Sequence, residues 1–191
     1  MAAKPLDVMI DIETLDTDIG AVILSIGACR FNANGIRSTY ERSISIDSCL
    51  EAGLSVDGDT LEWWLDQSDE AQEVLSGGDD LQTVLSDFAG WIKATNTPKH
   101  GEDRPPKIWA NSPSFDCVQL EHAYRALGMD IPWDYSNRRD YRTLQILPLD
   151  PEVDHNRTAH SAVDDAVYQA KKAQKALQFI EQTQQWELSE L

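Results

Sequence analysis

The sequence predicts a single α/β domain in which a mainly antiparallel group of strands comes first and helices cover the sheet. Three observations support this. The first 46 residues contain three runs with strand patterns, two of them joined by a turn signal. Helical patterns then alternate with a further short extended segment. The chain has 191 residues, enough for one compact core, so we expect one domain over residues 1–191.

The strand runs lie close together near the N-terminus. Residues 6–13, "LDVMIDIE", alternate between apolar and polar, and residues 21–31, "AVILSIGACRF", are almost continuously apolar. The motif "NANG" at 32–35 is a turn signal, and the run at 36–46, "IRSTYERSISI", alternates again. Short connections of this kind favour three antiparallel strands.

Helical spacing governs most of the remaining chain. Apolar residues favour helices at 59–67 and 79–94, and the proline-rich, polar segment 95–107 is expected to be a mobile loop. The other expected elements are a strand at 108–110, a helix at about 113–127, a loop at 129–138, a short helix at 139–147, a loop at 148–158 and a last helix at about 161–182.

Composition and charge restrict the function. Hydrophobic residues make up 41% of the chain and charged residues 26%, as in ordinary globular proteins. The formal net charge of −17 argues against a protein that coats nucleic acid, because such proteins are usually basic. It does not exclude a nuclease, since bound divalent cations reverse the local field of an acidic site.

The cysteines and the apolar runs bear on location. Three widely spaced cysteines, with no CxxC pair, suggest neither a zinc site nor a disulfide framework. No run of about 18 apolar residues is present, so no membrane span is expected. The start "MAAKPLDVMIDIE" contains acids too early for a signal peptide. A reducing cytoplasm fits these features.

The first unusual group of carboxylates is Asp11-Ile12-Glu13. Side chains two apart on a strand point to the same face, so Asp11 and Glu13 face away from the apolar side of their strand. Two adjacent carboxylates repel each other and lose hydration when buried, and a divalent cation between them would relieve both costs. A solvated acidic strand face explains the pattern equally well.

The second group is Asn111-Ser112-Pro113-Ser114-Phe115-Asp116, which follows the short strand "IWA". Ser112 can cap a helix with Pro113 at its first position, which places Asp116 in the first turn. The end of a strand is where the sites of α/β proteins gather. Taken alone, Asp116 is explained better by the helix dipole, which favours an acid at this position.

The third group is "HSAVDDA", residues 160–166. Ser161 and Asp164 match a capping box, with Asp in place of the usual Glu, and this puts His160 on the loop that enters the helix. Asp164 then has a structural task, whereas Asp165 has none. Asp165 neighbours Ala162 and Gln169, a small-residue face suited to close packing, so we expect Asp165 to point inward. A lone histidine is more often structural than catalytic.

The three groups together resemble the DEDDh (DnaQ-like) 3′–5′ exonucleases of the ribonuclease-H-like superfamily. The resemblance rests on Asp11-x-Glu13, Asn111-x-x-x-Phe115-Asp116 and His160-x-Ala162-x-x-Asp165, in this order. The stretches "TLEWWLDQSDEA" (60–71) and "NSPSFD" resemble the phage DexA-like and mycobacterial exoribonuclease-like branch. Many relatives have Gly where Leu15 stands. The resemblance implies a three-layer fold with a mixed five-stranded sheet flanked by helices.

The same resemblance implies a catalytic site. Asp11, Glu13, Asp116 and Asp165 would hold two Mg²⁺ or Mn²⁺ ions, with Asp11 bridging them, Glu13 and Asp165 completing one site and Asp116 holding the other. His160 would take the proton of the attacking water. The implied reaction releases 5′-mononucleotides from the 3′ end of a nucleic acid.

Substrate contacts are implied for Thr14, Leu15, Trp63, Asn111 and Phe115. Trp63 is expected to be available for stacking, while Trp64, at helical spacing with Leu61 and Leu65, is expected to be buried. The cluster Arg138, Arg139 and Arg142 can bind phosphates, but ion pairs with acids explain it at least as well, and Asp140 is assigned to such a pair.

The polymer is left open by these residues, because the catalytic groups attack phosphate in either case. The phage-like resemblance slightly favours single-stranded DNA over RNA, and a 3′–5′ exoribonuclease is the alternative. A non-catalytic interaction module on the same fold is a further alternative, disfavoured by the presence of all four acids and the histidine. Association into a homodimer is also left open.

Overall fold

A computed structural model of the chain describes residues 5–95, 104–147 and 160–189. Its centre is a five-stranded sheet of order β3-β2-β1-β4-β5. The strands are β1 (Asp7–Thr14), β2 (Ile23–Asn32), β3 (Gly35–Ser43), β4 (Ile108–Ala110) and β5 (Arg138–Asp140). The first three pair antiparallel, whereas β4 runs parallel to β1 and β5 parallel to β4. The mixed five-stranded sheet expected from the sequence is therefore confirmed.

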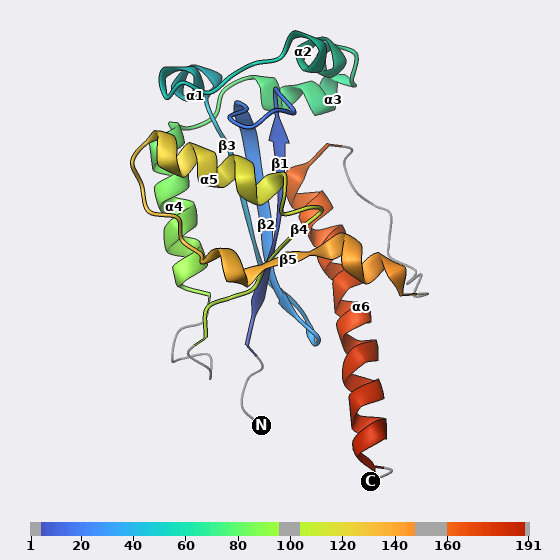
Figure 1. The fold of residues 1–191 in the computed structure, drawn as a ribbon. Coiled ribbons are helices and arrows are strands. Elements are labelled where there is room, and N and C mark those ends of the chain that lie inside the picture. The colour runs from blue at the N-terminus through green and yellow to red at the C-terminus, as the bar shows by residue number, and fades with distance from the viewer. Residues whose placement is uncertain (1–4, 96–103, 148–159, 190–191) are drawn as a thin grey trace.

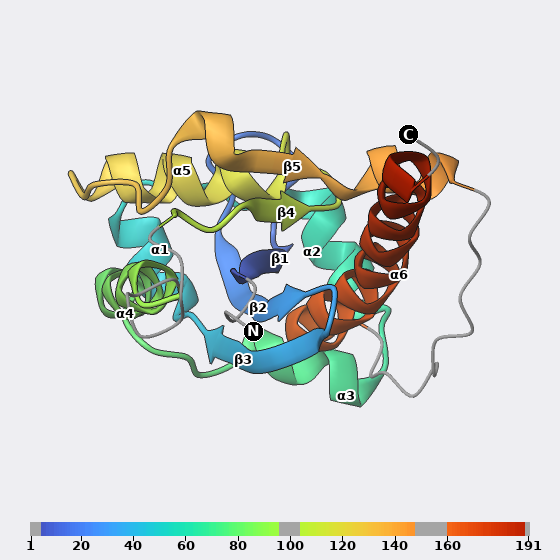
Figure 2. The ribbon, with the colours of Figure 1, turned by 90° about the horizontal axis from the view of Figure 1, so that it is seen from below.

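Helices lie on both faces of the sheet. They are α1 (Ile46–Glu51), α2 (Gly58–Leu65), α3 (Asp69–Gln72), α4 (Leu81–Lys93), α5 (Asp116–Ala126) and α6 (Ala162–Ser189), with 3₁₀ turns η1 (Glu73–Leu75), η3 (Tyr135–Asn137) and η4 (Tyr141–Ile146). Figures 1 and 2 show α4 and α5 on one face and α6 on the other, with α1, α2 and α3 gathered beyond the carboxyl end of β1.

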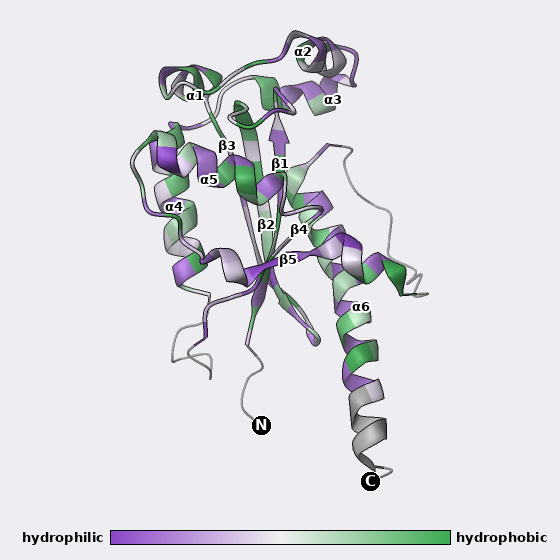
Figure 3. Cartoon of the chain, in the orientation of Figure 1, coloured by the Kyte–Doolittle hydropathy of each residue, from purple (hydrophilic) through white to green (hydrophobic). Residues whose placement is uncertain are grey.

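The two faces of β1 belong to two separate apolar cores. Val8, Ile10 and Ile12 pack with residues of α4 and α5, while Met9 packs with the alanines of α6. The alternation predicted from "LDVMIDIE" is thus confirmed. In Figure 3, α6 alternates between hydrophobic and hydrophilic colours along its length, as expected for a helix with one face on a sheet.

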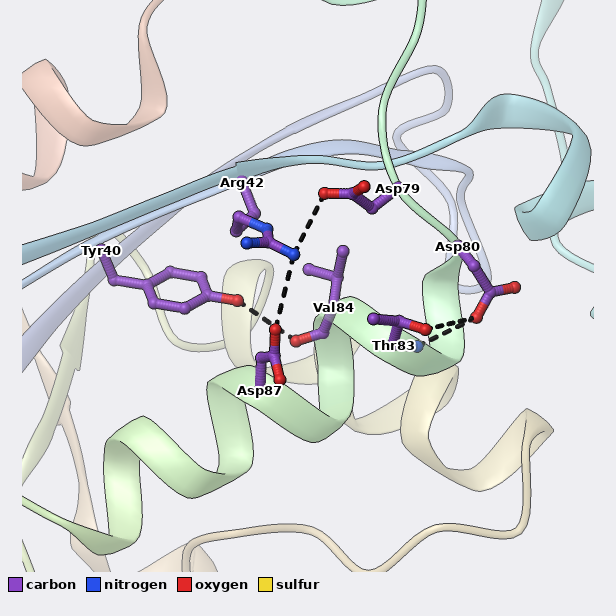
Figure 4. Close-up of polar contacts among 7 residues, drawn as sticks. All are labelled: Tyr40, Arg42, Asp79, Asp80, Thr83, Val84 and Asp87. Carbon is purple, nitrogen blue, oxygen red and sulfur yellow. Dashed lines mark hydrogen bonds and ion pairs between the residues drawn. The ribbon is translucent and has the colours of Figure 1, made fainter.

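Polar contacts join α4 to the outer strand β3 (Figure 4). The guanidinium of Arg42 lies 3.1 Å from Asp79 and 3.4 Å from Asp87, and the hydroxyl of Tyr40 donates to a backbone carbonyl of α4. Asp80 caps the helix, so that it begins at Leu81 rather than at residue 79. The ion pairs are half-exposed and contribute little to stability. Burial of the apolar face of α4 holds this helix in place.

Two predicted boundaries and one predicted helix cap in the first and middle parts of the chain are wrong. The third strand ends at Ser43, because residues Ile46–Glu51 form α1, whose N-cap Ser45 accepts the N–H of Ser48. The predicted helix at 113–127 begins only at Asp116. Ser112 does not cap this helix with its side chain. Its carbonyl instead accepts the N–H groups of Phe115 and Asp116, and these bonds form a turn before the helix.

The region after α5 also differs from the sequence prediction. Residues Arg138–Asp140 form the edge strand β5, where a loop and the start of a helix were expected. A three-residue strand made of two arginines and an aspartate carries no apolar alternation, so no sequence pattern marks it. The predicted helix at 139–147 appears as the shorter 3₁₀ turn η4.

The described residues bear on three further expectations. All three cysteines are buried and free, as expected for a chain without a disulfide framework. Within the described ranges, no helix combines the length and apolar character needed to cross a bilayer. Residues 96–103 of the expected loop at 95–107, and the expected loop at 148–158, lie outside the described residues.

Candidate active site

Three carboxylates converge where the carboxyl end of β1 meets the start of α6. Asp11 and Glu13 come from β1 and Asp165 from the first turn of α6, and one oxygen from each lies within 4.8 Å of the other two. Asp11 and Glu13 face the same side, as the strand alternation predicted. Because α6 lies across this side, the alternative of a solvated acidic strand face does not apply.

A glycine in β2 allows α6 to approach so closely. Gly27 pairs with Asp11 in the sheet register. A Cβ atom built on Gly27 would lie 2.0 Å from the carbonyl carbon of Ala162 and 2.1 Å from the nitrogen of Val163, so only glycine permits this contact. The sequence prediction missed this role, because the partner of Gly27 is far away along the chain.

The start of α6 orients its two adjacent acids differently. The hydroxyl of Ser161 accepts the N–H of Asp164 at 3.4 Å, and its carbonyl accepts the N–H of Asp165 at 2.9 Å. Asp164 therefore lies in the capping turn, and Asp165 belongs to the carboxylate group. This is the arrangement predicted from "HSAVDDA".

Asp116 brings a fourth carboxylate from the first turn of α5. Its side chain is 4% exposed, and it accepts hydrogen bonds from the backbone N–H groups of Ile12 and of Asp116 itself. Its charge acts on both Asp11 and Glu13. The four carboxylates that the sequence placed in three distant motifs are thus brought together at one end of β1.

The electrostatics of this group are unfavourable without a cation. Burial, together with the charges of Asp165 and Asp116, raises the pKa of Glu13 to about 8. Burial also raises the pKa of Asp116 to about 7, although backbone N–H groups and Arg142 oppose the shift. Burial and the charges of Asp116 and Glu13 hold the pKa of Asp11 well above its usual value. Desolvated, mutually repelling carboxylates favour either protons or cations.

The donor set suits hard divalent cations. All four groups are carboxylates, and oxygen donors of this type bind Mg²⁺ and Mn²⁺. The three converging oxygens are close enough to share one ion. The raised pKa values of Asp11 and Glu13 indicate that burial and repulsion between the acids outweigh the hydrogen bonds that these two groups receive. The site therefore fits the metal ions that the sequence resemblance implied.

A buried amide also contacts this group. Gln169 lies one turn after Asp165 on α6, is 6% exposed and donates from Nε2 to Oδ1 of Asp11 at 2.8 Å. The small-residue face of α6 noted in the sequence includes Gln169, but the sequence did not reveal its partner. Helical spacing from Asp165 is the signal that could have drawn attention to it.

A cavity of about 630 Å³ opens beside Glu13. Its lining includes Thr14, Trp63 and Phe115, three of the expected substrate contacts. Trp63 is 45% exposed and Trp64 only 1%, as predicted. Leu15 differs from the expectation: its side chain is 1% exposed and lies in the apolar core, because the turn after β1 directs it inward.

The same cavity is lined by aspartates that already have protein partners. Asp16 accepts the N–H of Asp18 at 2.8 Å and the hydroxyl of Ser55 at 2.7 Å. Asp57 caps α2 by accepting the N–H of Thr60 at 2.8 Å. These contacts shape the wall of the cavity, which the sequence did not reveal.

A second buried glutamine fixes the loop that follows β1. Oε1 of Gln119, on α5, accepts the N–H groups of Gly20 and Ala21, and its Nε2 donates to the carbonyl of Asp18 at 2.7 Å. Gln119 is 2% exposed, and its two bonds to Gly20 and Ala21 are buried. This loop, whose sequence departs from many relatives at Leu15, is therefore held rigidly against α5.

His160 lies against the two tryptophans of α2. Its ring centroid is 4.9 Å from that of Trp63 and 5.8 Å from that of Trp64, both in edge-on geometry. Its backbone φ of 61° is in the left-handed region, which non-glycine residues adopt rarely. His160 lines a second cavity, of about 360 Å³, together with Glu41, Glu70 and other residues. Its role as a base remains a prediction.

The three arginines of the cluster contact different partners. Arg138 forms an ion pair of 2.6 Å with the buried Glu121, and Arg139 donates to backbone carbonyls. Arg142 donates to the side-chain oxygen of Asn111 at 3.2 Å and lies close enough to Asp116 to lower its pKa. Among the described residues Asp140 makes no ion pair with these arginines. It accepts the backbone N–H of Arg142 and so caps η4.

Two solved structures share this fold. The nuclease domain of 3′hExo, a DEDDh family member bound to rAMP, aligns with a TM-score of 0.61 and 14% sequence identity, over 91% of this chain and 92% of that one. The cell-death related nuclease 4 (CRN-4) aligns with a TM-score of 0.57 and 11% identity, over 92% of this chain and 65% of that one. The layered architecture is thus that of DEDDh nucleases.

Comparison of the sequence with protein families gives a more specific result than the structural comparison. No individual curated protein matches the chain in sequence. Residues 6–177, which contain all four carboxylates, match the family described as the 3′-5′ exoribonuclease Rv2179c-like domain. This match spans most of the chain and agrees with the fold and with the convergence of acids. The chain therefore belongs to the family of Rv2179c-like 3′–5′ exoribonuclease domains.

Proposed function

We propose that the chain uses Asp11, Glu13, Asp116 and Asp165 to hold two Mg²⁺ or Mn²⁺ ions and removes 5′-mononucleotides from 3′ ends. The observation that carries this proposal is the convergence of the partly buried carboxylates of Asp11, Glu13 and Asp165 at the end of β1, where desolvation and repulsion raise the pKa values of Asp11 and Glu13. A pair of such ions stabilises both the attacking and the leaving oxygen of an in-line displacement.

The metal ligands and the general base would be residues of the chain itself. Asp11 is influenced by the charges of the other three acids and would contribute to both ions, while Glu13, Asp165 and Asp116 would supply the remaining carboxylate ligands. His160 would take the proton of the attacking water, because an imidazole changes charge near neutral pH. To do so, its ring would move out of the edge-on contacts with Trp63 and Trp64.

The cavity beside Glu13 would receive the terminal nucleotide. Trp63 and Phe115 offer aromatic surface there, and stacking on an aromatic side chain contributes about 1–3 kcal/mol per base. Asp16, Asp18 and Asp59 also line this cavity. Carboxylates accept hydrogen bonds from hydroxyl groups and repel phosphate, so the lining favours an end with a free 3′-hydroxyl over a 3′-phosphate.

The family description favours RNA as the polymer, whereas the phage-like resemblance slightly favoured single-stranded DNA. The deciding experiment uses purified protein with 5′-labelled single-stranded RNA and DNA of one sequence, in Mg²⁺, Mn²⁺ or EDTA. We expect stepwise shortening from the 3′ end with either cation and none with EDTA. Absence of cleavage of both polymers in every metal would overturn the proposal.

The role of His160 is tested separately from the metal site. For His160→Ala we expect a large loss of turnover, with Mn²⁺ affinity and melting temperature close to those of the parent protein. Trp63→Phe serves as the control, since it keeps an aromatic ring beside the imidazole. An unchanged rate for His160→Ala would exclude this histidine as the base.

The cysteines bear on the cellular compartment of the enzyme. Three buried free thiols suit a reducing compartment, and we propose the cytoplasm. The partners that the site chemistry supports are the 3′ ends of nucleic acids. A homodimer stays a prediction, which sedimentation of the purified protein at several concentrations would decide.

A further inference from the structure

The residue that carries a further inference is Gln169 of α6. It lies at the i+4 position from Asp165, so that both side chains leave the helix on the same face, toward β1. Its side chain is 6% exposed, and Nε2 donates to Oδ1 of Asp11 at 2.8 Å. Because Gly27 brings α6 close to the sheet, this contact forms without an intervening residue.

The chemistry of an amide suits this place. A lysine or arginine donating to Asp11 would bring a positive charge into the space where the cations are proposed to bind, and would compete with them. A neutral donor orients the carboxylate without that competition. The hydrogen bond from Gln169 therefore fixes the orientation of the Asp11 carboxylate with a neutral donor.

The carbonyl oxygen of the same amide lacks a hydrogen-bond partner among the described residues. Oε1 of Gln169 is buried and accepts no hydrogen bond from any described residue. Buried side-chain acceptors nearly always have a partner, and an exception calls for a specific explanation. Because Nε2 is fixed by Asp11, the amide keeps Oε1 beside the acidic site.

We propose that Gln169 is a positioning residue of the acidic site: Nε2 orients Asp11 for cation binding, and Oε1 accepts a hydrogen bond from water bound to the cation. This inference rests on the proposed metal-dependent function. Partners of metal ligands commonly change metal affinity by about ten- to a hundredfold when they are replaced.

The chain offers a matched control on the same helix. Gln174 is half-buried, and its Nε2 donates to the carbonyl of Ala33 at 3.1 Å, in the turn region between β2 and β3. Replacing either glutamine by methionine removes an amide of the same size from α6. Only Gln169→Met removes a contact with a proposed metal ligand.

The experiment measures Mn²⁺ binding by calorimetric titration and the Mn²⁺ concentration that gives half-maximal nuclease activity. For Gln169→Met we expect Mn²⁺ affinity to fall by about tenfold or more. The activity lost at low Mn²⁺ should be largely restored at high Mn²⁺, which a folding defect would not allow. Gln174→Met should bind Mn²⁺ as the parent protein does.

A second variant keeps the test decisive if Gln169→Met does not fold. Gln169→Asn keeps an amide but is one methylene too short to reach Asp11, and we expect the same loss of affinity. Mn²⁺ affinity within twofold of the parent in whichever variant folds would overturn the role of Gln169. Absence of Mn²⁺ binding by the parent protein would instead overturn the metal-dependent function itself.

Discussion

Two sets of acids lie within one short region of the molecule, and their surroundings are opposite. Asp16 and Asp57, in the cavity wall, accept hydrogen bonds from backbone N–H groups and hydroxyls, and these bonds lower the pKa of Asp16. Glu13 and Asp11, on the adjoining strand, are buried among other carboxylates and have raised pKa values. The residue types are the same in both sets.

The difference between the two sets lies in their surroundings rather than in the number of acids, and it separates acids that the fold itself stabilises from acids that we propose as metal ligands. An acid that receives several N–H groups is already neutralised by the fold. An acid that is buried beside like charges is stable only when protonated or when a cation is bound. The following predictions separate the two sets, beginning with the largest expected effect.

Glu13→Gln should remove activity while leaving the fold intact. The amide keeps the size of the side chain but loses the anionic ligand, and we expect a rate loss of roughly a thousandfold or more, because bound metal ions contribute several kcal/mol to such reactions. The metal-free variant should melt no lower than the parent at pH 8, since repulsion with Asp165 is relieved. A clear fall in its melting temperature would place Glu13 among the structural acids.

Gly27→Ala should damage the site without altering any acid. The new Cβ would lie 2.0 Å from backbone of α6, so the helix start and Asp165 must move away from β1. We expect loss of Mn²⁺ binding in titrations and a stability loss of about 1–3 kcal/mol in denaturant unfolding.

Gly90→Ala is the matched control for this change. Gly90 lies on the exposed side of α4, where an added Cβ meets nothing within 4 Å. The substitution should raise stability slightly, by up to about 1 kcal/mol, and leave Mn²⁺ binding unchanged. Equal behaviour of the two alanine variants would show that the close approach at Gly27 is dispensable.

The stability of the metal-free protein should fall as pH rises from about 5 to 8. The pKa of Glu13 rises from 4.5 in an unfolded chain to about 8 in the fold. Between these two pH values the folded state therefore holds more protons than the unfolded state. Melting in EDTA should therefore decline by on the order of 5 °C, and excess Mg²⁺ should reverse the decline at pH 8. If the melting temperature of the parent in EDTA did not change with pH, and Glu13→Gln behaved in the same way, Glu13 would not be the source of the pH dependence.

Asp57→Ala should have the smallest effect on the acidic site. Loss of the N-cap of α2 should lower stability by about 1 kcal/mol in denaturant unfolding. Mn²⁺ affinity should not change, because Asp57 already uses its oxygen to hold Thr60. A weakened Mn²⁺ affinity would mean that the two sets of acids are not independent.

Local patterns in the sequence were sufficient for several features of this site. Alternation along β1 placed Asp11 and Glu13 on one face, and the capping chemistry of Ser161 separated Asp164 from Asp165. Both inferences depend on residues within a few positions of one another. The family resemblance of the three motifs then implied the mixed sheet and its flanking helices.

Features that depend on distant partners were not predictable. Gly27 appears in the sequence only as a glycine within an apolar run, and its role depends on the backbone of α6. Leu15 was expected at the substrate, but the position of its side chain is set by the core beneath the turn. The edge strand β5 forms because β4 offers it a parallel partner, not because its three residues favour a strand.

The close contact between Gly27 and the start of α6 also has a consequence for biosynthesis. β1 and its partners are made early, but Asp165 is made late, and the three converging oxygens meet only when α6 packs against the sheet. A chain still being translated therefore carries an incomplete group of acids until residues of α6 have left the ribosome. If these acids act as proposed, the nascent chain would stay inactive until its last helix has packed against the sheet.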